Sequence, residues 1–132
     1  MIRLEPTLRP FFDPAGIVVI GASSAPAKLG FGVARNLVQS GYTGAIHFVN
    51  PMHAAIADVP DPVDLAVIIV AAPQVPDTLD EVGRRGIRAA IIASGGFRET
   101  GPEGAALEAE SLRVAREHAI RLLGPNCVGL IA

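Results

Sequence analysis

The chain has 132 residues, enough for one domain whose core needs neither disulfides nor metals. Half of the residues are apolar and Trp is absent, which favours a core of Ala, Val, Ile and Leu, as in buried parallel sheets. The net charge of -2 gives no general attraction to nucleic acid, and the single Cys127 fits a reducing compartment. Neither a membrane-spanning apolar run nor a signal-peptide core is present. We therefore predict a cytoplasmic protein that binds neither nucleic acid nor membranes.

Strand and helix patterns alternate along the chain. The predicted strands cover residues 16–21, 45–49, 65–70, 89–93 and 120–123, and the predicted helices cover 30–40, 75–85 and 103–118. Segment 52–63 contains Pro60 and Pro62 and has room for one short helical turn at most. Strands separated by helices indicate right-handed crossovers between parallel strands. The predicted fold is α/β: a single Rossmann-like, doubly wound domain over 1–132, with a mainly parallel five-stranded sheet and helices on both faces.

The expected strand ends are built from small, polar or rigid residues. They read Gly-Ala-Ser-Ser at 21–24, Asn-Pro at 50–51, Ala-Ala-Pro at 71–73, Ser-Gly-Gly-Phe at 94–97 and Gly-Pro-Asn-Cys at 124–127. In open parallel sheets, ligands bind outside the carboxyl ends of the strands, where the strand order reverses. Small residues leave the backbone open to a ligand there, so we expect the binding site at this edge.

The loop at 21–30 has the chemistry of a phosphate site. A helix N-terminus offers free N–H groups, while Ser23 and Ser24 add hydroxyls and Lys28 adds a positive charge. No acidic residue occurs from position 14 to position 57. The loop lacks the Gly-Lys-[Ser/Thr] of a Walker A motif. It also fits a dinucleotide fingerprint poorly, and Asn50 stands where an NAD site needs a carboxylate. A ligand with a phosphorylated ribose is compatible with this pattern.

The sequence resembles the coenzyme A-binding domain of the NDP-forming acyl-CoA synthetases, relatives of the succinyl-CoA synthetase alpha subunit; the same domain occurs in some protein lysine acetyltransferases. The resemblance covers nearly the whole chain in order. The matching segments are Pro-Phe-Phe-Asp-Pro at 10–14, Val-Ile-Gly-Ala-Ser-Ser at 19–24 with Pro26, Lys28 and Gly30, Asn-Leu at 36–37, Val-Asn-Pro at 49–51, Asp-Leu-Ala-Val at 64–67, Gly95, Phe97, Glu99, Gly101, and Leu-Leu-Gly-Pro-Asn-Cys-Val-Gly at 122–129.

The resemblance implies a CoA site running along the carboxyl edge. Its residues would be Gly21, Ala22, Ser23, Ser24, Pro26, Lys28, Gly30, Asn50, Pro51, Ala71, Ala72, Pro73, Ser94, Gly95, Gly96, Pro125 and Asn126. The two serines and Lys28 would meet the phosphates, and Asn50 and Pro51 would border the adenosine. The third strand end would line the site, residues 94–96 would lie along the pantetheine arm, and residues 125–126 would lie near the thiol.

Two departures from the family pattern concern the adenine side. Relatives often have a basic residue after Asn-Pro, where this chain has Met52 and His53, and their stretch before the next strand is longer. His53 replaces that charge only when protonated, and its reference pKa lies near 6.5.

Other polar side chains are interpreted as structural. We expect Cys127 to be a small buried residue, His47 and His118 to be structural or solvated, and Glu99 and Glu103 to favour the start of the long helix. Phe11 and Phe12 are expected to hold the N-terminal arm. The arginines at 84, 85 and 88 are expected at a solvated helix end. No catalytic or metal-binding set is predicted.

The leading hypothesis is CoA or acyl-CoA binding by the N-terminal part of a larger acid–thiol ligase. The resemblance implies acyl phosphate and phosphohistidine steps that need further synthetase domains or a partner subunit, so the isolated chain is predicted to be inactive. Two alternatives stay open: a stand-alone CoA-binding regulator, and an NAD(P)-dependent oxidoreductase domain, which the first loop and Asn50 disfavour.

Overall fold

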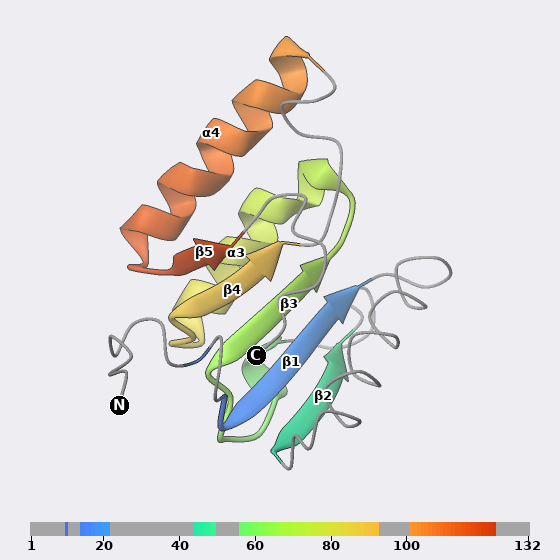
Figure 1. Cartoon of the computed structure of the whole chain (residues 1–132), viewed down its shortest axis with the longest axis vertical. Helices are drawn as coiled ribbons and strands as arrows, with labels where there is room; N and C mark the ends of the chain where they lie inside the picture. Colours follow the sequence, from blue (N-terminus) through green and yellow to red (C-terminus); the bar gives the residue numbers. More distant parts are fainter. Residues whose placement is uncertain (1–9, 11–13, 22–43, 50–55, 93–100, 124–132) are drawn as a thin grey trace, which may run out of the picture.

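The computed structural model describes residue 10 and residues 14–21, 44–49, 56–92 and 101–123. They form a five-stranded sheet in the order β2-β1-β3-β4-β5, and every neighbouring pair is parallel. Figure 1 shows the sheet with α3 and α4 lying together on one side of it. The elements are β1 (Gly16–Gly21), β2 (Ala45–Val49), η1 (Ile56–Asp58), β3 (Leu65–Ile69), η2 (Ala72–Gln74), α3 (Val75–Arg84), β4 (Ala89–Ile92), α4 (Pro102–Glu117) and β5 (Arg121–Leu123).

The predicted strands and the last two predicted helices are confirmed, with shifts of at most one residue at their ends. Helix α3 ends at Arg84 because Gly86 has a φ of +88°, a left-handed conformation that glycine adopts readily. Helix α4 begins one residue before the predicted start, at Pro102, whose fixed φ suits a first helical turn. The helix predicted at 30–40 lies outside the described residues.

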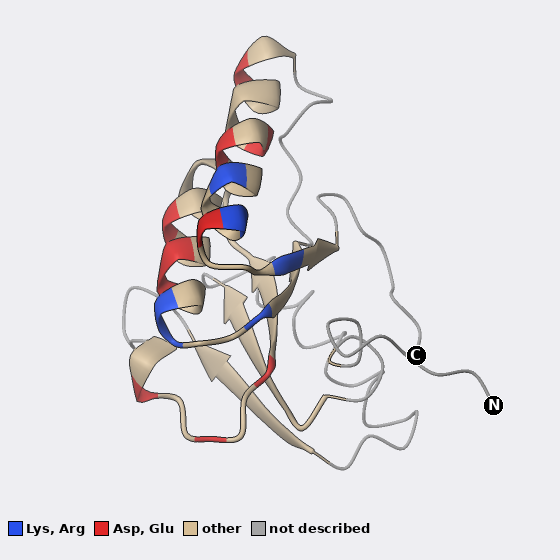
Figure 2. Cartoon of the chain, turned by 90° about the vertical axis from the view of Figure 1, so that its left-hand side faces the viewer, with Lys and Arg blue, Asp and Glu red and all other residues tan. Residues whose placement is uncertain are grey.

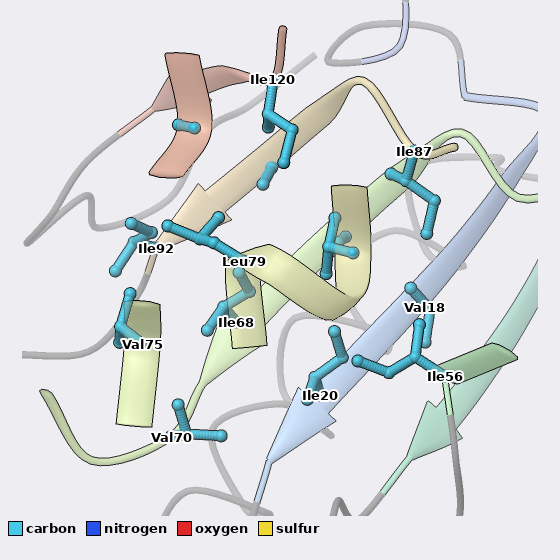
Figure 3. Close-up of a cluster of buried hydrophobic side chains, with 14 of the residues drawn as sticks. Val18, Ile20, Ile56, Ile68, Val70, Val75, Leu79, Ile87, Ile92 and Ile120 are labelled. Atoms are coloured by element: carbon cyan, nitrogen blue, oxygen red, sulfur yellow. The ribbon is translucent and has the colours of Figure 1, made fainter. Parts of the chain in front are cut away.

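The larger part of the core lies between the sheet and the helices α3 and α4. Figure 3 shows Leu79 of α3 among Ile68 of β3, Ile92 of β4 and Val75, and each of these four side chains is fully buried. Ile56 of η1 lies beside Val18 and Ile20 of β1 in the same cluster. Burial of such aliphatic side chains is the main driving force that fixes the helices on the sheet.

The opposite face of the sheet is also buried. A second cluster contains Ile17, Val19, Leu65, Val67, Ile69 and Ala89. Alternate residues of β1 and β3 therefore point into two different clusters, and both strands are continuous apolar runs. This is the pattern expected for central parallel strands that are covered on both faces.

The described part of the connection from β2 to β3, residues 56–64, contains one short turn, η1. The turn η1 is held by the burial of Ile56, and the next residues are held by Arg85, which follows α3 directly. The Arg85 guanidinium donates to the carbonyl of Val59 and to Oδ1 of Asp61, both at 2.7 Å. The three arginines at 84, 85 and 88 are expected at a solvated helix end, but the Arg85 side chain is only 18% exposed, because it fastens this connection to the end of α3.

The amino ends of β1 and β3 are joined through Asp64. Its carboxylate accepts hydrogen bonds from the backbone N–H of Ala15, at 3.0 Å, and of Gly16, at 3.1 Å. The Asp64 N–H in turn donates to the Gly16 carbonyl at 3.0 Å. A side chain on Gly16 would not fit, because an added Cβ would lie 1.8 Å from the Pro62 carbonyl oxygen. These contacts fix the pair of strands whose other ends form the candidate site.

Candidate functional site

The strand order reverses between β1 and β3. The chain leaves β1 for β2 on one side of the sheet and returns to β3 on the other side of β1. In doubly wound sheets such a reversal opens a crevice above the carboxyl ends of the two strands. Here those ends are Gly21 and Ile69, which pair with each other in the parallel register. The predicted edge is therefore the edge at which the topology places a ligand.

Gly21 keeps this point free of side chains. A Cβ added to Gly21 would lie 3.2 Å from the carbonyl oxygen of Ile69, closer than most side-chain contacts allow. The two strand ends thus approach each other with bare backbone on the β1 side. A larger residue at position 21 would need β3 to shift by a few tenths of an ångström, so Gly21 allows the ends of β1 and β3 to approach closely.

The predicted residues after β3 divide between the surface and the core. Ala71 and Pro73 are exposed, while the side chain of Ala72 is buried in the cluster beneath α3. Ala71 has an extended backbone and precedes η2, which leads directly into α3. The exposed pair can line a ligand with small apolar surface, and the side chain of Ala72 instead anchors the turn to the core.

The first turn of α3 suits an uncharged part of a ligand better than a phosphate. Pro76 has no N–H to donate, and the exposed Asp77 adds a negative charge. Gln74 makes no side-chain capping bond, and its carbonyl accepts the Thr78 hydroxyl at 2.8 Å. A phosphate would meet repulsion from Asp77, whereas amide or methylene groups would meet none.

The positive charges of the described residues lie away from this edge. Figure 2 shows charged residues along α3, α4 and the turns that join them to the strands, while the strands are mostly uncharged. The described arginines occur in the second halves of the two helices, just after α3, or at the starts of β4 and β5: Arg84, Arg85, Arg88, Arg113, Arg116 and Arg121. Among the described residues, none supplies a positive charge at the carboxyl ends of the strands, and Lys28 lies outside the described ranges.

The remaining predicted site residues lie outside the described part of the chain. They are Ala22, Ser23, Ser24, Pro26, Lys28, Gly30, Asn50, Pro51, Ser94, Gly95, Gly96, Pro125 and Asn126. In the sequence they follow β1, β2, β4 and β5, whose carboxyl ends the structure places along one edge. Of the predicted residues, Gly21, Ala71, Ala72 and Pro73 are described, and all four belong to the ends of β1 and β3.

Comparison with known proteins gives this domain a ligand. Residues 15–132 match the family model described as a CoA binding domain. The chain belongs to this family. As a CoA-binding domain, it takes coenzyme A as its ligand.

Relatives of this CoA-binding domain include long synthetases and synthetase subunits. The chain is 42% identical over 135 residues to the ADP-forming acetate–CoA ligase II of Archaeoglobus fulgidus, covering 96% of this chain and 20% of that protein. It is 37% identical over 138 residues to the alpha subunit of the ADP-forming acetate–CoA ligase I of Pyrococcus furiosus, covering 95% of this chain and 30% of the subunit. The chain thus spans about a fifth to a third of the length of these relatives.

Solved structures share the fold. The apo form of the dinucleotide forming acetyl-coenzyme A synthetase 1 of Candidatus Korarchaeum cryptofilum matches with a TM-score of 0.79 and 37% identity, over 90% of this chain and 28% of that one. A hypothetical protein from Pyrococcus horikoshii matches in fold alone, with a TM-score of 0.64 and 15% identity, over 96% of this chain and 93% of that one. The fold therefore occurs both within long synthetases and as nearly the whole of a solved chain.

Several contacts were not evident from the sequence. The ring of His118 bonds to Asp80 of α3 at 2.8 Å, and this bond, together with the nearby Arg84, holds the pKa of the Asp80 carboxyl below its ordinary value. In the described ranges, no group of three or more His, Cys, Asp or Glu side chains could hold a metal ion. None of the helices in these ranges has the length and apolar character that crossing a membrane requires.

Proposed function

We propose that this CoA-binding domain works as part of an NDP-forming acid–thiol ligase, where it holds CoA while an acyl group is joined to the thiol. The observation that carries this proposal is the reversal of strand order at Gly21, within a domain whose family binds CoA. Similarity to ADP-forming acetate–CoA ligases over almost the whole chain supports the reaction class. The cytoplasm, where CoA and nucleotides are available, is the proposed location.

The charges of the nearby residues guide our proposal of which part of CoA lies at which strand end. The phosphates of CoA lie over the β1 and β2 ends with Ser23, Ser24 and Lys28, in the stretch without acidic residues. The pantetheine arm crosses the bare backbone at Gly21 and passes Ala71 and Pro73. The thiol then lies toward the ends of β4 and β5, where residues 94–96 and 125–126 follow the strands. The negative Asp77 favours this direction over the reverse.

The chain by itself is proposed to bind without catalysing. The pair of His118 and Asp80 lies where α4 ends and β5 begins, at the opposite edge of the sheet from the candidate site. This pair cannot act as an acid or base on a CoA thiol at the carboxyl edge, because general acid–base catalysis requires hydrogen-bond reach. Further domains or a partner subunit would supply the acyl-transfer groups.

The test is calorimetric titration with CoA, dephospho-CoA and NAD. We expect saturable binding of CoA, weaker binding of dephospho-CoA and no binding of NAD. Lys28→Ala should weaken CoA binding about tenfold, since it removes one charge contact to phosphate. The matched control is Arg84→Ala, which removes one positive charge from an exposed side chain at the far end of α3. Binding of NAD without CoA would overturn the proposal.

A second candidate is a stand-alone CoA-binding protein. The hypothetical protein from Pyrococcus horikoshii favours it, since this fold makes up nearly all of that solved chain. A ligase domain needs further synthetase domains or a partner subunit, whereas a stand-alone CoA-binding protein needs neither. Addition of a nucleotide-binding synthetase partner, with acetate, ATP and CoA, should give acetyl-CoA if the domain belongs to a ligase, and should give none if it acts alone.

A further inference from the structure

Phe48 presents an aromatic ring near the carboxyl end of β2. The residue is 54% exposed, and it is the only aromatic residue in the described ranges. Within these ranges, Leu112 is the only other large apolar residue that is exposed, and it lies inside α4. Phe48 is instead the second-last residue of a strand that ends at the carboxyl edge of the sheet. Its ring can therefore gain contact area from a flat ligand group at that edge.

The strand register puts Phe48 on the same face of the sheet as Gly21. Phe48 pairs with Val19 of β1, and Gly21 follows Val19 by two residues, so all three belong to one face. It is the face of the second core cluster, which contains Val19 and Ile69, the register partner of Gly21. From the spacing of strands and of residues along them, the Cα atoms of Phe48 and Gly21 lie roughly 8 Å apart. The exposed ring thus lies beside the point where the strand order reverses.

The nearest strand positions leave this side of the Phe48 ring without neighbouring side chains from β1 and β2. Gly21, the next β1 residue on this face toward the carboxyl edge, has no side chain. Val49, the last residue of β2, belongs to the core cluster on the opposite face. A flat group that lies against the ring from the carboxyl edge therefore meets backbone of β1, and neither strand end places a side chain in its way.

Adenine is the part of CoA whose chemistry suits an aromatic ring. Phosphates need positive charge or N–H donors, and the pantetheine arm is a flexible chain, whereas a base stacks its flat face on aromatic side chains. The sheet order also favours the base at this place. Strand β2 lies on the opposite side of β1 from β3, where the arm is proposed to pass. A single ribose joins the base to the phosphates proposed over the β1 and β2 ends, so the base comes next to β2.

We infer that Phe48 binds the base of CoA, with its phenyl ring stacked against the adenine. This inference rests on the proposed function, and it adds a contact that involves neither the phosphates nor the pantetheine arm. Stacking uses the face of the ring and reads no hydrogen-bonding groups, so Phe48 contributes affinity for the ligand without selecting one base over another.

The first test compares variants of Phe48 by calorimetric titration with CoA and with adenosine 3′,5′-bisphosphate, which lacks the pantetheine arm. Phe48→Ala should weaken both ligands about tenfold, a loss typical of removing one ring that stacks on a base. Phe48→Tyr keeps the ring and should bind both ligands as wild type does, whereas Phe48→Leu stays apolar without a ring and should bind them more weakly. The matched control is Leu112→Ala, which removes the other exposed apolar side chain and should change neither affinity. If Phe48→Leu binds CoA as tightly as wild type, the inference is wrong.

The second test observes the contact itself by fluorescence. The chain contains no Trp, so Phe48→Trp introduces a single indole at this position. Binding of CoA should quench its emission because adenine stacks on the indole, and 4′-phosphopantetheine, which lacks the adenosine, should leave the emission unchanged. If calorimetry shows that Phe48→Trp binds CoA while its emission stays the same, the inference is wrong. If wild type fails to bind CoA, the proposed function itself is wrong.

Discussion

Asp64 offers a sharp test of how the sheet holds its central strands together. We expect Asp64→Asn to destabilise the fold although the side chain keeps its size. The carboxylate accepts from two backbone N–H groups, of Ala15 and Gly16, one with each oxygen. An Asn can accept with its single oxygen, but its NH₂ group then faces the other N–H, and two donors repel each other.

The magnitude follows from these two bonds. A hydrogen bond to a charged group contributes about 1.5 to 3 kcal/mol, and the lower figure suits the exposed bond to Ala15. Losing one such bond and weakening the other to a neutral one gives an expected loss of about 2 kcal/mol in the free energy of unfolding. Urea unfolding followed by circular dichroism measures this loss, with the slope of the transition expected to stay constant.

The matched control is Asp77→Asn, which removes the same charge from an exposed position at the start of α3. We expect a change within about 0.5 kcal/mol for this control. If Asp64→Asn costs no more than Asp77→Asn, then the two N–H bonds do not stabilise the β1–β3 pair, and the account of Asp64 given above is refuted.

Two other expectations follow from the core and from the α3–α4 contact. Leu79→Ala should cost about 3 kcal/mol in urea unfolding, because the side chain is fully buried between α3 and the sheet and its loss leaves a cavity; a cost under about 1 kcal/mol would contradict this packing. The pKa of Asp80 is lowered from 3.8 by the hydrogen bond with His118, so the stability gained from this bond is present above pH 3.8 and is lost as the pH falls through the lower folded value. Urea midpoints measured from about pH 5 down to about pH 2.5 should therefore fall less steeply in Asp80→Asn than in wild type, and equal slopes would refute this linkage.

Much of the secondary structure could be predicted because the sequence patterns that indicate strands and helices are local. The apolar runs at 16–21 and 65–69 are strands that need no partner to be recognised, since each is buried on both faces and ends at Gly or small residues. The helix starting at Pro102 and the stop after Arg84 likewise follow from proline and glycine in the sequence. The family resemblance rested on the same strand ends and was confirmed by the family model.

What only the tertiary structure decided concerns residues far apart in the chain. The order β2-β1-β3-β4-β5 brings Gly21 next to Ile69, and no local pattern contains that pairing. No sequence pattern indicated the partners of Asp64 and His118, which lie 48 and 38 positions away, at Gly16 and Asp80. Hydrophobic periodicity reports which face of an element is buried, whereas hydrogen-bond partners depend on where the chain returns, and that is settled by packing. The sequence alone thus determined the kind of fold and the family, and packing decided which polar side chains hold the amino ends of the strands together.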